Sequence, residues 1–306
     1  MLLPLKGSTG QYLANLGRMQ SAMDTAQREV SSGLRVSRAS DDPSALNTIL
    51  QLQADIASNQ QIQSNFSQTT SDLDSADSSL QAALKLVDHA VSLATQAAST
   101  NVTAAQRTGI AGEISSLQQQ MLGISQTEVN GRYIFSGDAD TSPSYVLDAT
   151  QPNGVRQVST AGSTHVIQDI NGITIPTSKT AAEIFDAQNP DGTAAAGNVF
   201  AALSNLVTAL NNNDSTAIQG GVTSLKSAGD HLNLQLEFYG EASARVTRSQ
   251  DLAKKFLVEK QSELSTNRDA DIATAAIQLS QATTEQQASL TAQAKISKLS
   301  LFDYLA

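Results

Sequence analysis

Long stretches without helix-breaking residues constrain this chain more than any other feature. From Ser44 to Ala98 there is neither proline nor glycine, and apolar residues recur at intervals of seven. Seven residues make two turns of a helix in a coiled coil, so these positions share one face. The row consists of Phe66, Leu73, Leu80, Val87 and Ala94. The sequence therefore predicts one long helix whose apolar face packs against partner helices.

Polar residues occupy the corresponding positions nearer the start of this helix. They are Asn59, Gln60 and Gln63. A polar residue in a coiled-coil row can fix the register between two helices. These residues either form such a contact within the chain or face neighbouring subunits, and the sequence leaves both interpretations open.

The last third of the chain has the same helical character. Gly221 to Leu305 contains no proline, and its apolar residues alternate between spacings of four and three. The segment from Ser280 to Gln293 is small or polar, yet a dense apolar cluster follows it: Ile296, Leu299, Leu301, Phe302 and Leu305. A lone helix with so polar a segment buries too little to offset the conformational entropy lost on folding. We therefore expect partner helices on more than one side of it.

A first helix is predicted from Tyr12 to Ser31. Its apolar residues keep spacings of three and four, and they are Leu16, Met19, Met23, Ala26 and Val30. Packing between helices is the simplest role for the two methionines. Gly33 supplies the left-handed residue that ends this helix. Asp42 then caps the next helix, and Pro43 suits its first position, where a missing N–H costs nothing.

Beyond the long helix, the sequence predicts a shorter helix and then a change of structure. Thr103 and Gln106 fit a capping box that opens a helix ending at Asn130-Gly131. From Arg132 to about Gly197, proline and glycine separate short apolar runs, and Asn-Gly pairs at 153–154 and 171–172 are hairpin signals. A small β-rich insertion is therefore expected there. Helix resumes at Asn198 and continues into the last third.

These patterns predict a mainly α fold: a long antiparallel coiled-coil or helical-bundle rod, with a small β-rich inserted domain. The N- and C-terminal segments form the rod. The expected parts are an N-terminal helix and turn (1–42), a long helical rod (43–137), the β-rich insertion (138–197), a return segment of the rod (198–268) and a C-terminal helix (269–306). The first and last parts are expected to form an assembly layer.

Composition excludes several functional classes. The net charge of -10 argues against nucleic acid and anionic membrane surfaces as partners. Cysteine is absent, which excludes disulfides and thiolate metal sites, and aromatic residues make up only 4%, so no aromatic-rich core is expected. No run of 18 apolar residues occurs, and the amino terminus does not resemble a secretory signal. On this evidence alone the sequence indicates a cytoplasmic protein.

No constellation of catalytic residues is visible. His89, His165 and His231 are far apart in the sequence, and none has a second ligand at the spacing of a metal site. No phosphate-binding or dinucleotide-binding glycine motif occurs. We expect a protein without enzymatic activity, cofactor or metal.

Several motifs resemble the bacterial flagellin family. They are SSGLRV at 31–36, SDDP at 40–43 and the segment from Ala105 to Gly137. Within that family, NGRYIFSG at 130–137 and SLFDYL at 300–305 are more similar to the hook-associated members at the hook–filament junction. Filament flagellins usually carry DDAAGL-like residues where this chain has DDPSAL at 41–46. The leading MLLPLKGSTG departs from the short polar start typical of the family.

The resemblance implies an extracellular structural protein that is exported through the flagellar type III apparatus without a cleaved signal. It implies self-association into a ring, a second hook-associated protein on the hook side, flagellin on the filament side and a chaperone on the C-terminal helix. The assembly interface would then include the apolar residues of both terminal helices: Leu16, Met19, Met23, Val30, Ile296, Leu299, Leu301, Phe302 and Leu305. The alternatives are a filament flagellin and, in another class, a cytoplasmic coiled-coil or chemoreceptor-like signalling rod.

Overall fold

The computed structural model describes residues 4–302, and the side chains of residues 10–295. The chain forms two compact units: residues up to Ser58 together with those from Phe256 onward, and residues from Asn59 to Lys255. Helices α2 (Pro43–Ala97) and α6 (Ser215–Arg268) contribute to both units. The described residues are mainly helical, and the strands among them are two or three residues long. The predicted fold class is confirmed, whereas the division into five parts stays a prediction.

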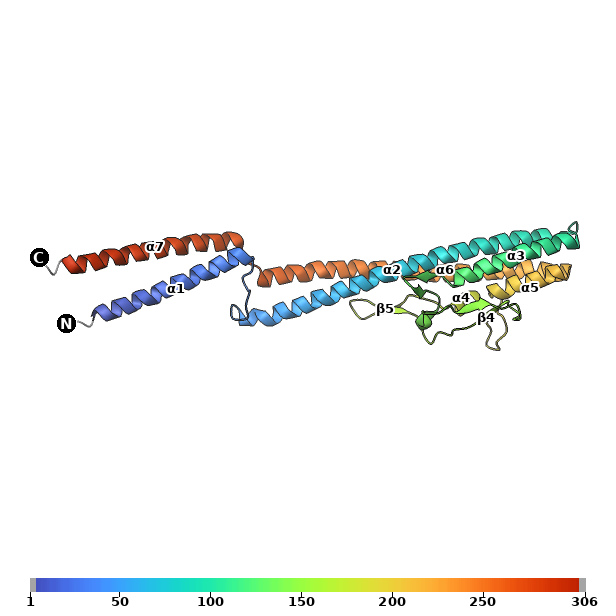
Figure 1. Ribbon diagram of the computed structural model, residues 1–306, viewed down its shortest axis with the longest axis horizontal. Helices are drawn as coiled ribbons and strands as arrows, with labels where there is room; N and C mark the ends of the chain where they lie inside the picture. The colour runs from blue at the N-terminus through green and yellow to red at the C-terminus, as the bar shows by residue number, and fades with distance from the viewer. Residues whose placement is uncertain (1–3, 303–306) are drawn as a thin grey trace. The chain divides into compact units, whose positions relative to one another are not determined.

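In the first unit, α1 (Pro4–Ser32) and α7 (Ile272–Phe302) run antiparallel and side by side (Figure 1). The predicted start of α1 at Tyr12 was eight residues too late. Gly7 and Gly10 lie inside the helix, since each glycine weakens a helix by only about 1 kcal/mol relative to alanine and does not end one. Pro4 is tolerated because it lies in the first turn.

A second, small core belongs to the same unit. Its fully buried members are Val36, Ile49, Leu52 and Leu264. Val36 comes from the turn after α1, the next two from the first turns of α2, and Leu264 from the end of α6. This core therefore anchors the turn to both long helices.

In the second unit, α3 (Ala104–Ser125) begins at the predicted capping box. The Thr103 N–H donates to Gln106 Oε1 at 2.8 Å, and the Gln106 N–H donates to Thr103 Oγ1 at 3.3 Å. The helix ends at Ser125, and its predicted end at Asn130-Gly131 was wrong. Asn130 and Gly131 have φ values of 52° and 78° and join β1 (Glu128–Val129) to β2 (Arg132–Tyr133) in a two-residue hairpin. Asn-Gly is the preferred sequence for that turn.

The β-rich part consists of short antiparallel pairs. Tyr145–Leu147 (β3) pairs with Val155–Gln157 (β4), and Val166–Gln168 (β5) pairs with Thr174–Pro176 (β6). The Asn-Gly signals lie in the loops that join each pair. A 3₁₀ turn, η1 (Gly137–Ala139), and a short helix, α4 (Ala181–Phe185), also occur there. The prediction missed α4, because five residues are too few to show a helical period.

The helical return was predicted without a break, and this was wrong. Helix α5 (Val199–Asn211) ends before Asn213, whose φ of 54° is left-handed. Asp214 then accepts hydrogen bonds from the N–H groups of Thr216 and Ala217, at 3.0 and 3.1 Å, and caps α6. Asn and Asp favour this kind of local turn over a continuing helix.

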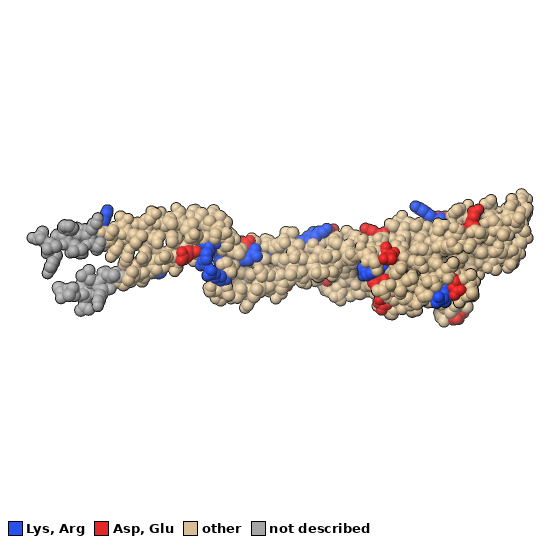
Figure 2. Space-filling view, in the orientation of Figure 1, with Lys and Arg blue, Asp and Glu red and all other residues tan. Residues whose placement is uncertain are grey.

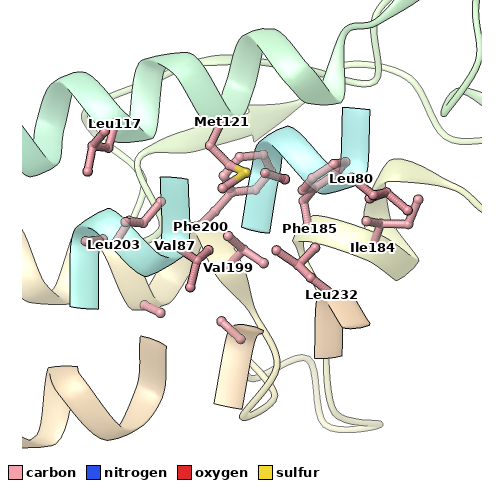
Figure 3. Close-up of a cluster of buried hydrophobic side chains, with 14 of the residues drawn as sticks. Leu80, Val87, Leu117, Met121, Ile184, Phe185, Val199, Phe200, Leu203 and Leu232 are labelled. Atoms are coloured by element: carbon pink, nitrogen blue, oxygen red, sulfur yellow. The ribbon is translucent and has the colours of Figure 1, made fainter. Parts of the chain in front are cut away.

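The core of the second unit follows the predicted rows. Residues 66, 73, 80 and 87 of α2 are at most 1% exposed. They share the core with residues of α3, α5 and α6, as Figure 3 shows for Leu80 and Val87. Six aromatic residues are fully buried in this core, contrary to the expectation from composition: Phe66, Phe135, Tyr145, Phe185, Phe200 and Tyr239. The Phe135 ring meets Phe185 and Tyr239 edge-on, with centroids 5.7 and 6.3 Å apart. A low overall aromatic content did not prevent their concentration at one place.

Candidate assembly surfaces

The predicted interface residues of α1 lie on the side that packs against α7. Leu16, Met19, Met23 and Val30 are half-buried, and Ala26 on the same stripe is 2% exposed. Tyr12 extends this stripe, and its hydroxyl donates to the Ser289 carbonyl of α7 at 3.5 Å. Part of each of these four α1 side chains is therefore already covered within the chain.

Among the described residues, α1 and α7 bury no large apolar side chain fully between them. Among the described side chains of this α1–α7 pair the fully buried apolar ones are alanines: Ala26, Ala275 and Ala282. Large apolar residues are exposed on both helices, namely Leu13, Ile272, Ile277 and Leu290. A pair of helices can cover only one face of each member, so the remaining faces stay available to other chains.

The C-terminal part of the predicted interface is only partly visible. Ile296, Leu299, Leu301 and Phe302 belong to the helical backbone of α7, but their side chains lie outside the described residues. Leu305 lies outside the described residues altogether. Their role in assembly stays a prediction.

The turn after α1 is tied to the connection between α6 and α7. Gly33 has a φ of +72°, and its carbonyl accepts the Ala270 N–H at 2.9 Å. The N–H groups of Arg35 and Val36 both donate to the Arg268 carbonyl, at 2.8 and 3.1 Å. A left-handed residue is needed to reverse the chain here, and glycine adopts that conformation without a steric cost.

Two adjacent carboxylates organise the rest of this turn. Asp42 Oδ1 accepts hydrogen bonds from Ser44 Oγ at 2.6 Å and from the Ala45 N–H at 3.1 Å, directly before Pro43, the first residue of α2. The Ser44 hydroxyl and the Ala45 N–H, with help from Arg35, lower the pKa of Asp42 to about 2. Asp42 therefore remains ionised throughout the neutral and mildly acidic range.

Sequence reasoning gave no role to Asp41, Arg35 or Arg268. Asp41 Oδ2 accepts from the N–H groups of Arg38 and Ser37, at 2.7 and 3.1 Å, and the Arg38 N–H contributes most to lowering its pKa. Arg35 contacts the Asp42 carboxylate at 3.1 Å and the Asn267 carbonyl at 2.5 Å. The pair of acids before a proline was the available signal for Asp41. The hydrogen bonds that join Arg35 to the Asn267 and Arg268 carbonyls instead span more than 200 residues of sequence.

The polar residues in the α2 row make a contact inside the second unit. Asn59 is 2% exposed, and its Nδ2 donates to the Ala253 carbonyl of α6 at 3.1 Å. Gln63 Nε2 donates to Asn59 Oδ1 at 2.9 Å and lies 3.3 Å from the same carbonyl. Asn59 and Gln63 therefore form a polar contact within the chain, while Gln60 is exposed. The question that the sequence left open is settled for Asn59.

The three histidines lie in different surroundings. His231 Nε2 is 2.9 Å from the Glu183 carbonyl, His165 is 4.0 Å from Asp140, and His89 is exposed on α2. Within residues 4–302 no three histidine or acidic side chains are grouped closely enough to hold a metal ion. No helix in this described part has the length and apolarity needed to cross a bilayer.

The comparison with protein families identifies the N-terminal part. Residues 7–140 match the model of the bacterial flagellin N-terminal helical region. This part of the chain is therefore similar to the flagellin N-terminal region. The resemblance that the sequence motifs indicated is therefore confirmed. No curated protein matches the sequence.

The fold is similar to that of solved hook-associated proteins. A Vibrio parahaemolyticus structure assigned as a flagellar hook-associated protein is 16% identical, with 75% of this chain and 100% of that chain covered and a TM-score of 0.65. Flagellar hook-associated protein-3 of Legionella pneumophila is 13% identical (71% and 98% covered, TM-score 0.61). FlgL of Bacillus cereus is 19% identical (72% and 99% covered, TM-score 0.51). These likenesses show the fold, and with the family match they support a structural protein of the flagellin family.

Proposed function

We propose that this chain forms the junction between the flagellar hook and filament, as a ring of identical subunits. The observation that carries the proposal is the fold: the chain covers the full length of hook-associated relatives, at TM-scores up to 0.65. The flagellin match of residues 7–140 and the closing SLFDYL motif support it. The other candidate is a filament flagellin, which the same N-terminal match would also fit.

The two units suggest separate tasks in such a ring. The α1–α7 pair leaves apolar residues uncovered, so it suits packing among the terminal helices of several subunits. In this proposal residues 1–42 and 269–306 form the assembly layer, and the apolar residues of both terminal helices line it. The bundle of the second unit has its own large core and supports the assembly layer.

The proposal includes an extracellular location on the flagellum and export through the flagellar type III apparatus. The expected neighbours are further copies of this chain, a second hook-associated protein towards the hook and flagellin towards the filament. An export chaperone would cover the C-terminal helix before assembly, because Ile272, Ile277 and Leu290 of that helix are 46–60% exposed.

Electron microscopy distinguishes the two candidates. The gene is deleted in the source bacterium and restored with an epitope inserted in the exposed loop at Asp191-Gly192, and flagella are then labelled with gold. A junction protein gives label at one position beside the hook, and the deletion strain releases filament subunits into the medium. Label along the whole filament would instead establish a filament flagellin.

A further inference from the structure

A shallow groove with a volume of about 240 Å³ lies in the second unit, between α6 and the β5–β6 pair. Ile173 and Leu252, which are 60% and 42% exposed, provide its apolar surface. Arg245 and Arg248 provide its positive charge. The acid in its lining, Asp169, is turned to its own loop, where Oδ1 accepts the N–H groups of Asn171 and Ile173 at 2.8 Å.

The basic residues of this groove continue along α6 as one stripe. Arg245, Arg248, Leu252 and Lys255 are exposed and spaced by three, four and three, so they share one face of the helix. Among the described residues Arg248 and Lys255 have no acidic partner. Arg245 pairs only with Glu241 of the same helix, an exposed contact of the kind that is easily exchanged.

The same chain carries a complementary stripe on α2. Ser71, Asp74 and Ser78 are exposed on one face, and Asp77 lies beside them. Asp72, on another face of α2, is paired with Arg132 at 3.2 Å, whereas the described residues provide no cation for Asp74. Asp77 accepts only a hydrogen bond from Gln81 Nε2, at 2.7 Å. This stripe is therefore acidic and bordered by small side chains.

The spacing of the two stripes matches. Arg245 and Arg248 are three residues apart, as are Asp74 and Asp77, and three residues correspond to about 4.5 Å along a helix. The small serines around Asp74 would let the α2 backbone approach Leu252 and Ile173 closely. On the face shown in Figure 2 charged residues are sparse.

We infer that the α6 groove binds the α2 stripe of a second copy of this chain, with Arg245 and Arg248 opposite Asp74 and Asp77. The inference rests on the proposed function, because it supplies a contact between subunits. The two surfaces differ, so each copy can bind one neighbour through α6 and another through α2. Such a heterologous contact closes into a ring or continues as a helix.

Cross-linking tests the contact in assembled flagella, and the absence of cysteine makes the chain suitable. A variant with both Arg248→Cys and Asp74→Cys replaces the natural chain, and isolated flagella are treated with a short bis-maleimide linker. The expected result is a ladder at multiples of 32.1 kDa from the double variant and none from either single variant. Cross-links from Arg248→Cys alone would show a two-fold contact and overturn the inference. A cross-link to a protein of another mass would overturn it too.

Exchange of the charges gives a second, independent readout. The pair Arg245→Glu and Arg248→Glu should lower the amount of the protein retained on flagella about tenfold, as should Asp74→Lys with Asp77→Lys. All four changes together should restore it. The matched control is Lys85→Glu with Lys226→Glu, which changes the charge equally at exposed residues outside both stripes and should have no effect. Circular dichroism of each secreted variant checks folding.

The outcomes separate this inference from the proposed function. If the ladder and the charge rescue occur while gold label runs along the filament, the contact stands and the junction assignment fails. If label remains at the hook, with neither ladder nor rescue, the junction assignment stands and the α6–α2 contact is wrong.

Discussion

The bundle of the second unit and the α1–α7 pair follow the same helical spacing but bury very different side chains. In the bundle, positions seven residues apart hold Leu73, Leu80 and Val87 on α2 and Leu225, Leu232 and Tyr239 on α6, all at most 2% exposed. In the pair, the fully buried positions hold alanines, and leucine and methionine are half-buried or exposed. The spacing sets which residues face a partner, while the number of partners sets how deeply they are covered.

This difference indicates which of the two regions contributes most to the stability of the single chain. Each fully buried large apolar side chain contributes roughly 1.5–3 kcal/mol, and an alanine contributes much less. The bundle surrounds its rows with several helices, so it gains the full contribution. The α1–α7 pair gains only part of it, and its remaining apolar surface is available for assembly.

The largest expected effect comes from truncation after Leu299, which removes the cluster that contains Leu301 and Phe302. If neighbouring subunits cover the apolar residues of the α1–α7 pair, the truncated protein should no longer be incorporated beside the hook. Filament subunits should then appear in the medium. The melting temperature of the secreted monomer should change by less than about 2 °C, because the bundle core is untouched. Asp303→Asn, which keeps the apolar cluster, is the control. A truncated protein that still carries a filament would contradict this view of the pair.

Replacing leucine by alanine should lower the free energy of unfolding in the bundle but leave it nearly unchanged in the α1–α7 pair. Leu80→Ala removes a fully buried side chain of the bundle and should lower the free energy of unfolding by roughly 2–5 kcal/mol. Leu290→Ala removes a side chain that is 51% exposed on α7, and it should change the free energy of unfolding by less than about 0.5 kcal/mol. Urea unfolding of the monomers measures both. Leu290→Ala should nevertheless weaken incorporation into flagella. Equal losses of stability would show that the pair has a core that we underestimate.

A smaller effect is expected at the polar contact of the bundle. Asn59→Ala removes the hydrogen bond to the Ala253 carbonyl and the one from Gln63, and should cost roughly 1–2 kcal/mol of unfolding free energy. Gln60→Ala, at an exposed neighbouring position, should be close to neutral. Urea unfolding again provides the comparison. If both variants were neutral, the contact would contribute nothing to the stability of the bundle.

The smallest effect concerns the cap at the start of α2. The pKa of Asp42 is lowered from 3.8 to about 2 in the folded chain, so its contribution to stability is complete above about pH 4 and is lost as the pH falls through 2. The protection of the Ala45 amide, measured as its exchange rate relative to that of an unstructured peptide at the same pH, should therefore fall over that range. In Asp42→Asn this fall in protection should be absent, because Asn still caps the helix but does not titrate. Identical profiles for the two proteins would exclude Asp42 as the titrating group.

The sequence by itself determined the local features of this protein. The rows of α2 and α6, the Thr103–Gln106 capping box, the helix start at Pro43 and the Asn-Gly loops of the β pairs were all predicted. Each of these features depends on residues that are close together in the sequence, so each can be recognised without knowing its tertiary contacts. The flagellin-family motifs belong to the same class, since they are short continuous stretches.

Only the tertiary structure decided features that depend on distant residues. Whether Asn130-Gly131 ends a helix or joins two strands is undecided locally, because the same pair serves both as a helix end and as a hairpin turn. Asn59 donates a hydrogen bond to the Ala253 carbonyl, and Arg35 donates one to the Asn267 carbonyl. Both pairs are so far apart in the sequence that no local pattern predicts them. The concentration of aromatic residues around Phe135 and the groove beside Arg248 likewise arise from elements that meet only in the folded chain. Chain connectivity sets local conformation, but packing decides which surfaces are covered and which remain for a neighbour.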